Sequence, residues 1–243
     1  MSTQKIIHLN GLSLKSRTPP LKLSDYKLIA FDMDSTLINI ECIDEIASVV
    51  GLREEVARIT EMTMQGEILD FKESLRQRVK LLKGAPAAAL EQVYNQRLRL
   101  NPGAQRLLEI CRTAGLKSVL VSGGFTYFAD RVKALLQIDF ARSNALEIKD
   151  GYLTGGLVPQ EWGEICDGEE KKKMLLQTCQ INKIDLSQTI TVGDGSNDIP
   201  MMISCSSAGG LSVAYHAKPV VRENALLCID EGGLDRILEF FTS

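Results

Sequence analysis

The sequence predicts an α/β fold in which a doubly wound parallel sheet forms a Rossmann-like core and a small helical bundle is inserted as a cap. Short apolar runs recur along the chain, and such runs suit strands buried on both faces of a parallel sheet. Helix-like segments separate most of these runs, which is the alternation of a doubly wound sheet. Between residues 40 and 100 helical patterns follow one another without a strand, and this interruption predicts the cap.

The expected core strands follow a short lead-in. Residues 1–26 form this lead-in, with one strand over residues 5–9 and a turn at Pro19-Pro20. A β-hairpin is expected around residues 147–157, because Asp150-Gly151 is typical of a two-residue turn. The apolar runs that we interpret as parallel strands are 28–31, 118–121, 189–192, 211–214 and 226–229.

Local signals also predict the core helices. Asn101 is a good N-cap and Pro102 a good first helical residue, so we expect a helix from there to Ala114, stopped by Gly115. The other expected core helices lie near residues 125–136, 169–179 and 234–241.

Four helices are expected in the cap. Gly51 closes the first and Gly66 the second, Asp70-x-x-Glu73 resembles a capping box for a third over residues 71–82, and Pro86 starts a fourth that reaches residue 97. The predicted domains are therefore the lead-in, a core made of residues 27–39 and 101–243, and a cap made of residues 40–100.

Composition excludes several classes of protein. The 243 residues are 44% hydrophobic and 24% charged, which rules out a disordered or low-complexity chain. The net charge is −3, so no basic field predicts binding to nucleic acid or to an anionic membrane. No apolar run approaches the roughly 18 residues that span a bilayer, and the N-terminus lacks the pattern of a signal peptide. We therefore expect a soluble cytoplasmic protein.

The numbers and spacing of the histidines and cysteines disfavour two kinds of metal site. His8 and His216 are the two histidines, too few for a histidine-rich metal cluster, and we assign neither a catalytic role. The six cysteines are scattered without a CxxC pair, which disfavours a structural zinc site and predicts free thiols in a reducing compartment.

The first candidate site is the string FDMDST at residues 31–36, which directly follows the first core strand. Asp32 and Asp34 are ionisable groups at the end of a buried strand, and an unpaired buried charge is unfavourable. A divalent cation would explain them, because Mg²⁺ prefers one or two carboxylates together with waters and phosphate oxygens.

Three further motifs are candidates for phosphate chemistry. Ser122-Gly123-Gly124 joins a strand to a helix, where a hydroxyl and exposed backbone N–H groups can bind an anion. In the string VGDGSND, Asp194 is a candidate metal ligand and Asn197 a polar contact, with Asp198 behind them. In the run Lys171-Lys172-Lys173 one lysine could reach a phosphate, although a charge run is usually a solvated face.

Taken together, these motifs resemble the haloacid dehalogenase (HAD) superfamily. Acidic, Ser/Gly, Lys and acidic motifs occur in the order and character of that superfamily, and the resemblance covers almost all of residues 25–243. Glu41, residues 64–82, VSGGF, VGDGSND and AYHAKP are similar to the members that hydrolyse O-phospho-L-serine to L-serine and phosphate, the last step of serine biosynthesis. Members of this type carry a helical cap after the first motif.

The resemblance implies a role for each residue of the phosphate site. Asp32 would be the nucleophile that forms an aspartyl-phosphate, and Asp34 the general acid and base. Mg²⁺ would bind the side chains of Asp32 and Asp194 and the backbone carbonyl of Asp34, with Asp198 supporting this shell. Ser122, the Gly123 N–H and Lys171 would hold the phosphoryl oxygens, and Asn197 would contact phosphate or substrate. Lys172 or Lys173 replaces Lys171 if the helix register differs.

The resemblance also implies how the cap reads the substrate. Glu41 would bind the substrate ammonium group and Arg78 its carboxylate through a bidentate fork. Met64 and Phe71 would supply apolar walls.

Three other functions stay open at this point. A phosphotransferase could pass phosphate from Asp32 to another hydroxyl, such as that of homoserine, within the same pocket. A HAD phosphatase could act on a different small phosphomonoester. A receiver-like phosphoacceptor could store phosphate on Asp32 as a signal, but a cap of some 60 residues would enclose a small substrate and exclude a partner protein. The sequence does not determine an oligomeric state.

Overall fold

A computed structural model describes residues 6–64 and 70–242, and the side chains of Thr63 and Met64 lie outside the described part. Its main sheet has nine strands in the order β1-β2-β10-β9-β8-β4-β5-β6-β7 among these residues, and those from β10 to β6 run parallel. The predicted fold class is confirmed. The strands are β1 (Ile6–Leu9), β2 (Leu12–Lys15), β4 (Leu28–Phe31), β5 (Lys117–Phe125), β6 (Phe140–Lys149), β7 (Tyr152–Val158), β8 (Thr189–Gly193), β9 (Leu211–Tyr215) and β10 (Leu227–Ile229).

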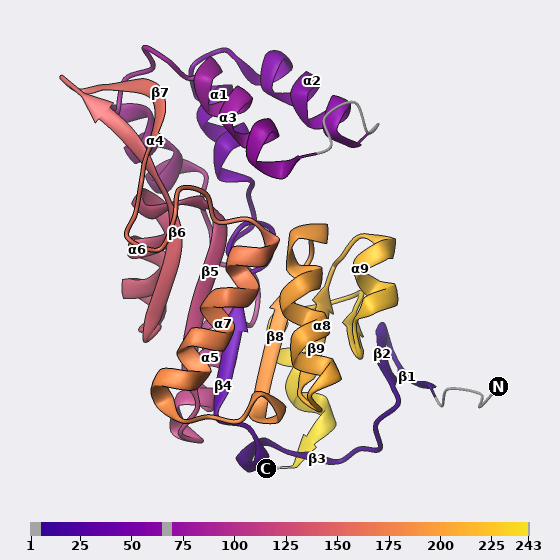
Figure 1. Ribbon diagram of the computed structural model, residues 1–243. Helices are drawn as coiled ribbons and strands as arrows, with labels where there is room; N and C mark the ends of the chain where they lie inside the picture. Colours follow the sequence, from indigo (N-terminus) through magenta and orange to yellow (C-terminus); the bar gives the residue numbers. More distant parts are fainter. Residues whose placement is uncertain (1–5, 65–69, 243) are drawn as a thin grey trace.

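Helices cover both faces of this sheet (Figure 1). In the central strand β4, Ile29 and Phe31 belong to the core shared with α5 (Ala104–Thr113) and α6 (Thr126–Leu136). Leu28 and Ala30 belong to a second core shared with α7 (Gly168–Asn182) and α8 (Ile199–Ser207). Successive side chains of a strand point to opposite faces, so a fully apolar strand is what a sheet covered on both sides requires.

The described residues of the inserted segment form four helices, and α1, α2 and α3 lie beyond the ends of the central strands, with α3 packed against β7 (Figure 1). Glu73 bonds Gln77 in the next turn instead of returning to the N-cap, so the expected capping box does not form and Asp70 alone caps its helix by accepting from Lys72 N. Gly66, the expected end of the second cap helix, lies outside the described residues. The helices are α1 (Cys42–Val49), α2 (Arg53–Met64), α3 (Phe71–Leu81) and α4 (Ala88–Gln96).

The two connections between sheet and inserted helices run side by side. Ile38 and Leu100 form an antiparallel bridge. The Asn101 side-chain amide donates to the carbonyls of Ser35, Thr36 and Ile38 at 3.3, 2.8 and 3.1 Å. The prediction that Asn101 and Pro102 open α5 is therefore wrong, because Asn101 is used across the connection and α5 begins at Ala104.

The ends of the chain add structure that the sequence pattern did not predict. β2 pairs with β10, so the hairpin β1–β2 extends the main sheet, and β3 (Leu21–Lys22) pairs with β11 (Phe241–Thr242). A short helix, α9 (Pro219–Asn224), was also not expected, and the last expected helix is a 3-10 helix at Leu234–Phe240. The hairpin at Asp150-Gly151 is confirmed between β6 and β7. The division into lead-in, core and cap stays a prediction.

Candidate active site

Three parallel strands bring their polar residues to one edge of the sheet. Phe31 of β4 pairs with Leu120 of β5 on one side and with Val192 of β8 on the other. Asp32 therefore directly follows the last paired residue of β4. Ser122 lies two residues after Leu120, and Asp194 lies two residues after Val192. These residues line a cavity of about 480 Å³ that the inserted helices cover.

Lys171 is the centre of a buried charge cluster. Its side chain is fully buried, and Nζ donates to Asp32 Oδ1 and Asp198 Oδ1 at 2.7 Å each. Burial, followed by the nearby Asp198 and Asp194, raises the pKa of Asp32 well above its usual range, although Lys171 opposes this rise. One lysine thus serves several carboxylates, and the cluster keeps an excess of negative charge when they are ionised.

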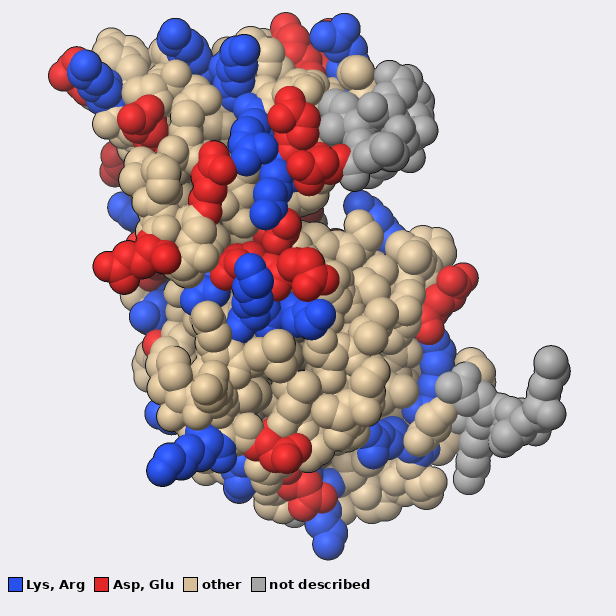
Figure 2. All heavy atoms as spheres, in the orientation of Figure 1, with Lys and Arg blue, Asp and Glu red and all other residues tan. Residues whose placement is uncertain are grey.

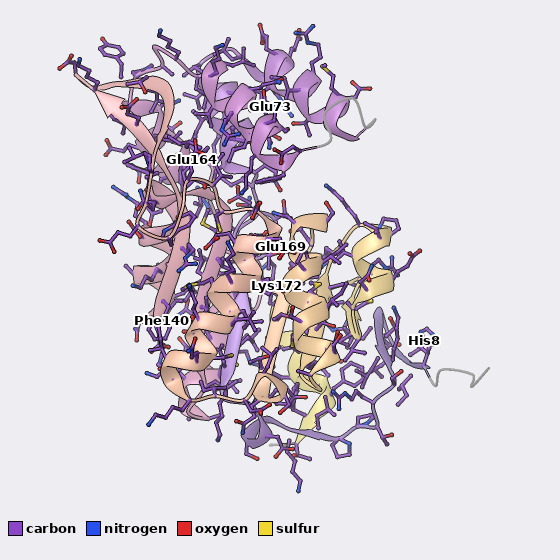
Figure 3. The ribbon with its side chains drawn as sticks, in the orientation of Figure 1. His8, Glu73, Phe140, Glu164, Glu169 and Lys172 are labelled. Atoms are coloured by element: carbon purple, nitrogen blue, oxygen red, sulfur yellow. The ribbon has the colours of Figure 1, made fainter. Side chains whose placement is uncertain are left out.

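The structure distinguishes Lys171 from its two neighbours. Lys172 pairs with Glu169 at 3.4 Å and Lys173 with Glu170 at 3.2 Å. Glu169 and Lys172 lie on the outer surface of α7 (Figure 3). Of the three lysines, Lys171 is the one whose ammonium group contacts Asp32.

Asp198 orders the loop that carries Asp194. Its Oδ2 accepts from the backbone N–H groups of Asp194 and Gly195 at 3.1 and 3.0 Å. A Cβ added at Gly193 would lie 2.3 Å from Asp198 Oδ2, so this close approach requires glycine. Asp198 thus holds the backbone of the loop at Asp194 and Gly195. Of the three aspartates, Asp32 and Asp194 face the cavity.

The carboxylates fit a hard divalent cation. Oxygens of Asp32, Asp194 and Asp198 lie within 4.8 Å of one another. Thr36, which sequence reasoning did not single out, donates to Asp194 Oδ1 at 3.0 Å. Burial, with Asp198 and Glu41 nearby, raises the pKa of Asp194 to about 7. Crowded carboxylates whose charge is unfavourable without a counterion are the donor set that Mg²⁺ prefers.

Asp34 lies in a different environment. The backbone N–H and thiol of Cys42 contact its two oxygens at 2.9 and 3.1 Å. Burial, followed by the charge of Glu41, raises the pKa of Asp34 to about 7. A carboxyl group with a pKa near the working pH can both donate and accept a proton, as an acid–base catalyst must.

We expect the stabilising effect of Mg²⁺ to grow with pH. Asp194, a side-chain ligand in this assignment, has a pKa of about 7 in the folded chain but about 4 when unfolded, so its protonation stabilises the fold at low pH and this contribution is lost as the pH rises through 7. The cation binds the ionised form. Thermal unfolding should show a rise in Tm of roughly 5 °C on saturation with Mg²⁺ at pH 8 and little rise at pH 5.5. Equal rises in Tm at both pH values would contradict the assignment of Asp194 as a ligand of the cation. Asp194→Asn should reduce the rise in Tm at pH 8.

The turn at Ser122–Gly124 lines the same cavity as Asp32. Ser122 is buried, and its Oγ accepts from Gly124 N at 2.9 Å. A Cβ added at Gly123 would lie 2.9 Å from the ring of Phe71, so glycine lets this cap residue close over the turn. Asn144, which was not anticipated, donates to the Gly123 carbonyl at 2.7 Å and fixes this peptide.

The cap wall carries groups of opposite charge. Glu41 and Arg78 both line the cavity. The Ser35 hydroxyl donates to Glu41 Oε1 at 2.6 Å, and Arg78 Nε donates to the Ser74 carbonyl at 3.4 Å. Burial lowers the pKa of Arg78, but a guanidinium group remains charged at neutral pH.

Other residues at the site were missed or cannot be placed. Asp44, one helical turn from Glu41, lines the cavity, and burial raises its pKa. Lys218 and the predicted Asn197 also line the cavity. The spacing of Asp44 from Glu41 was a usable signal, whereas Lys218 was visible only as a member of AYHAKP. Met64 ends α2, and its predicted contact falls outside the described side chains.

The comparisons with known proteins agree with this geometry. The family model of the haloacid dehalogenase-like hydrolases matches residues 29–202, most of the chain. The chain therefore belongs to the haloacid dehalogenase-like hydrolases, and it is an enzyme of that family.

More similar relatives narrow the group. A phosphoserine phosphatase of Polaromonas sp. (strain JS666) is 63% identical over 229 residues, which are 94% of this chain and 95% of the relative. Two solved structures, described as a phospho-aspartyl intermediate analogue and a substrate-bound complex of phosphoserine phosphatase, each have a TM-score of 0.79 and 39% identity, and cover 89% of this chain and 99% of their own. Within its family, the chain thus groups with the phosphoserine phosphatases.

Proposed function

We propose that this enzyme is a Mg²⁺-dependent phosphatase that hydrolyses O-phospho-L-serine to L-serine and phosphate through an aspartyl-phosphate on Asp32. The observation that carries the proposal is one cavity with a strand-end aspartate at its base and both Glu41 and Arg78 on its wall. A carboxylate and a guanidinium complement the ammonium and carboxylate of an amino acid. The names of the similar proteins, phosphoserine phosphatases, support the same substrate.

In the first step Asp32 attacks phosphorus and the bond from phosphorus to the seryl oxygen breaks. Asp34 gives its proton to that oxygen, so L-serine leaves as a neutral alcohol and Asp32 carries the phosphoryl group. Ser122, the Gly123 N–H, Lys171 and Asn197 are assigned to the phosphoryl oxygens, where fixed donors stabilise the charge that develops during transfer.

In the second step Asp34 accepts a proton from water, whose oxygen attacks phosphorus. The bond between phosphorus and Asp32 breaks, inorganic phosphate leaves, and Asp34 is again protonated for the next cycle. Mg²⁺ held by Asp32, Asp194 and the Asp34 carbonyl would offset the like charges of nucleophile and phosphate.

Arg78 should determine affinity for the amino-acid part of the substrate. Arg78→Lys keeps a positive charge but removes the bidentate fork, and we expect KM for phosphoserine to rise about tenfold while kcat changes little. Arg76→Lys is the matched control, because Arg76 lies on the same helix and pairs with Glu164 at the surface at 2.8 Å. An unchanged KM in Arg78→Lys would favour a different phosphomonoester as the substrate.

The decisive experiment measures Mg²⁺-dependent phosphate release from L-phosphoserine with and without excess homoserine. Rapid release that homoserine does not alter supports the phosphatase and excludes the signalling alternative. Release that falls as phosphohomoserine appears would make the enzyme a phosphotransferase with the same site. No turnover in either condition would overturn the substrate and the roles of Glu41 and Arg78.

The proposal includes the cellular setting. Hydrolysis of phosphoserine would end serine biosynthesis, which places the enzyme in the cytoplasm with a small metabolite as its partner. None of the helices within residues 6–64 and 70–242 has the length and apolar character needed to cross a bilayer. Acidic and basic side chains are interspersed over the face seen in Figure 2, a distribution that favours a small substrate over nucleic acid.

A further inference from the structure

Cys42 contacts both oxygens of one carboxyl group. It is the first residue of α1, and its side chain is fully buried. Its backbone N–H donates to Asp34 Oδ2 at 2.9 Å, and its thiol lies 3.1 Å from Asp34 Oδ1. The ordinary pKa of a thiol is about 8.5, so the sulfur carries a proton at neutral pH and can donate it.

Two donors from one residue restrain a carboxyl group more than either does alone. With the backbone contact only, the carboxyl group of Asp34 can still turn through a limited range about its Cβ–Cγ bond before Oδ2 leaves hydrogen-bond distance. The thiol contact at Oδ1 blocks that rotation. Each carboxylate oxygen has two acceptor positions, so both oxygens can accept from Cys42 and still present an acceptor or a proton to the cavity that Asp34 lines.

We propose that the Cys42 thiol is a positioning residue that holds the carboxyl plane of Asp34 in line with the oxygen of the leaving group. This inference rests on the proposed function, in which Asp34 is the acid and base. Proton transfer requires donor and acceptor within roughly 2.6–3.2 Å, and small misplacements of such groups are felt strongly in rate. Because Cys42 directly follows Glu41, the turn that enters α1 carries both the contact for the ammonium group and the restraint on the acid.

The test compares Cys42→Ala, Cys42→Ser and Cys111→Ala. Cys111 is a buried thiol of α5 without a role in the site, so it controls for loss of packing. Each variant is assayed with L-phosphoserine and with aryl phosphates whose leaving groups range from good to poor. Cys42→Ala should lower kcat/KM about tenfold for phosphoserine, where the departing alkoxide needs a proton, and much less for p-nitrophenyl phosphate. KM should change little, and Cys42→Ser should recover most of the rate because its hydroxyl also donates.

The slope of log kcat/KM against leaving-group pKa separates positioning from general damage. Loss of a well-placed acid steepens this slope in Cys42→Ala, whereas a fold defect lowers all substrates equally. A parallel slope, or equal losses in Cys42→Ala and Cys111→Ala, would overturn the inference. If the wild-type enzyme fails on phosphoserine, the proposed substrate is wrong, yet the aryl series still decides the role of Cys42.

Discussion

Asp32→Asn is expected to abolish turnover, with kcat reduced by more than about 10⁴-fold, the scale on which loss of a nucleophile is felt. An amide cannot attack phosphorus to form a stable acyl phosphate, so acid quenching of a reaction with labelled phosphoserine should trap phosphoenzyme in the wild-type enzyme and none in the variant. Measurable phosphoenzyme or near-normal turnover in Asp32→Asn would refute the mechanism.

The fold of this variant should persist. Asparagine has the shape of aspartate, and its oxygen can still accept from Lys171, whose ammonium also bonds Asp198 at 2.7 Å. Removing the charge of Asp32 also relieves the repulsion from Asp198 and Asp194 that, together with burial, raises the pKa of this carboxyl group. Asp139→Asn is the matched control at the opposite end of the sheet, where Asp139 pairs with Lys117, and it should keep full activity.

Lys171→Met should lose both activity and stability. The fully buried ammonium bonds two carboxylates of low exposure, and removing one partner of such a group leaves buried charge uncompensated, at about 3–5 kcal/mol in free energy of unfolding. Urea unfolding at pH 8 should reveal this loss, and the deficit should shrink as the pH falls, because burial raises the pKa of Asp32 and favours its neutral form. Lys172→Met removes an exposed charge of the same helix and should alter neither property.

A double variant separates the two roles of Lys171. Adding Asp198→Asn to Lys171→Met removes one of the stranded charges, so we expect part of the stability to return. Activity should stay absent, because nothing replaces the ammonium group assigned to the phosphoryl oxygens. Recovery of activity together with stability would mean that Lys171 serves the fold alone.

The sequence was most informative where strand burial dictates geometry. Apolar strands in a parallel sheet must align their carboxyl ends, and this predicted that Asp32, Ser122 and Asp194 meet. The choice among Lys171, Lys172 and Lys173 depended on the rotation of α7 against the sheet, which packing determines. Thr36 and Asn144 act through contacts with residues more than 20 positions away, and no local pattern encodes such pairs.

In two of the errors, a polar side chain with a capping pattern bonds a different partner. Asn101 has the local character of an N-cap and Asp70-x-x-Glu73 that of a capping box, yet Asn101 bonds three carbonyls across the connection and Glu73 bonds Gln77. For Asn101, these tertiary contacts outweigh a capping preference of about 1 kcal/mol. For Glu73, the competing partner is a side chain one turn further along the same helix. The strand β2 was missed because its alternation of buried and half-buried residues extends over only four positions, too few to stand out in the sequence.

The two connections between the sheet and the inserted helices are bonded to each other and would act as a single hinge. Ile38 and Leu100 are bridged and Asn101 ties down residues 35–38, so the two tethers of the cap cannot swing independently. The helical bundle lies on one side of these connections, and the loop that follows Asp34 lies on the other. A rotation of the bundle about these connections would therefore also move residues 35–38, which directly follow Asp34.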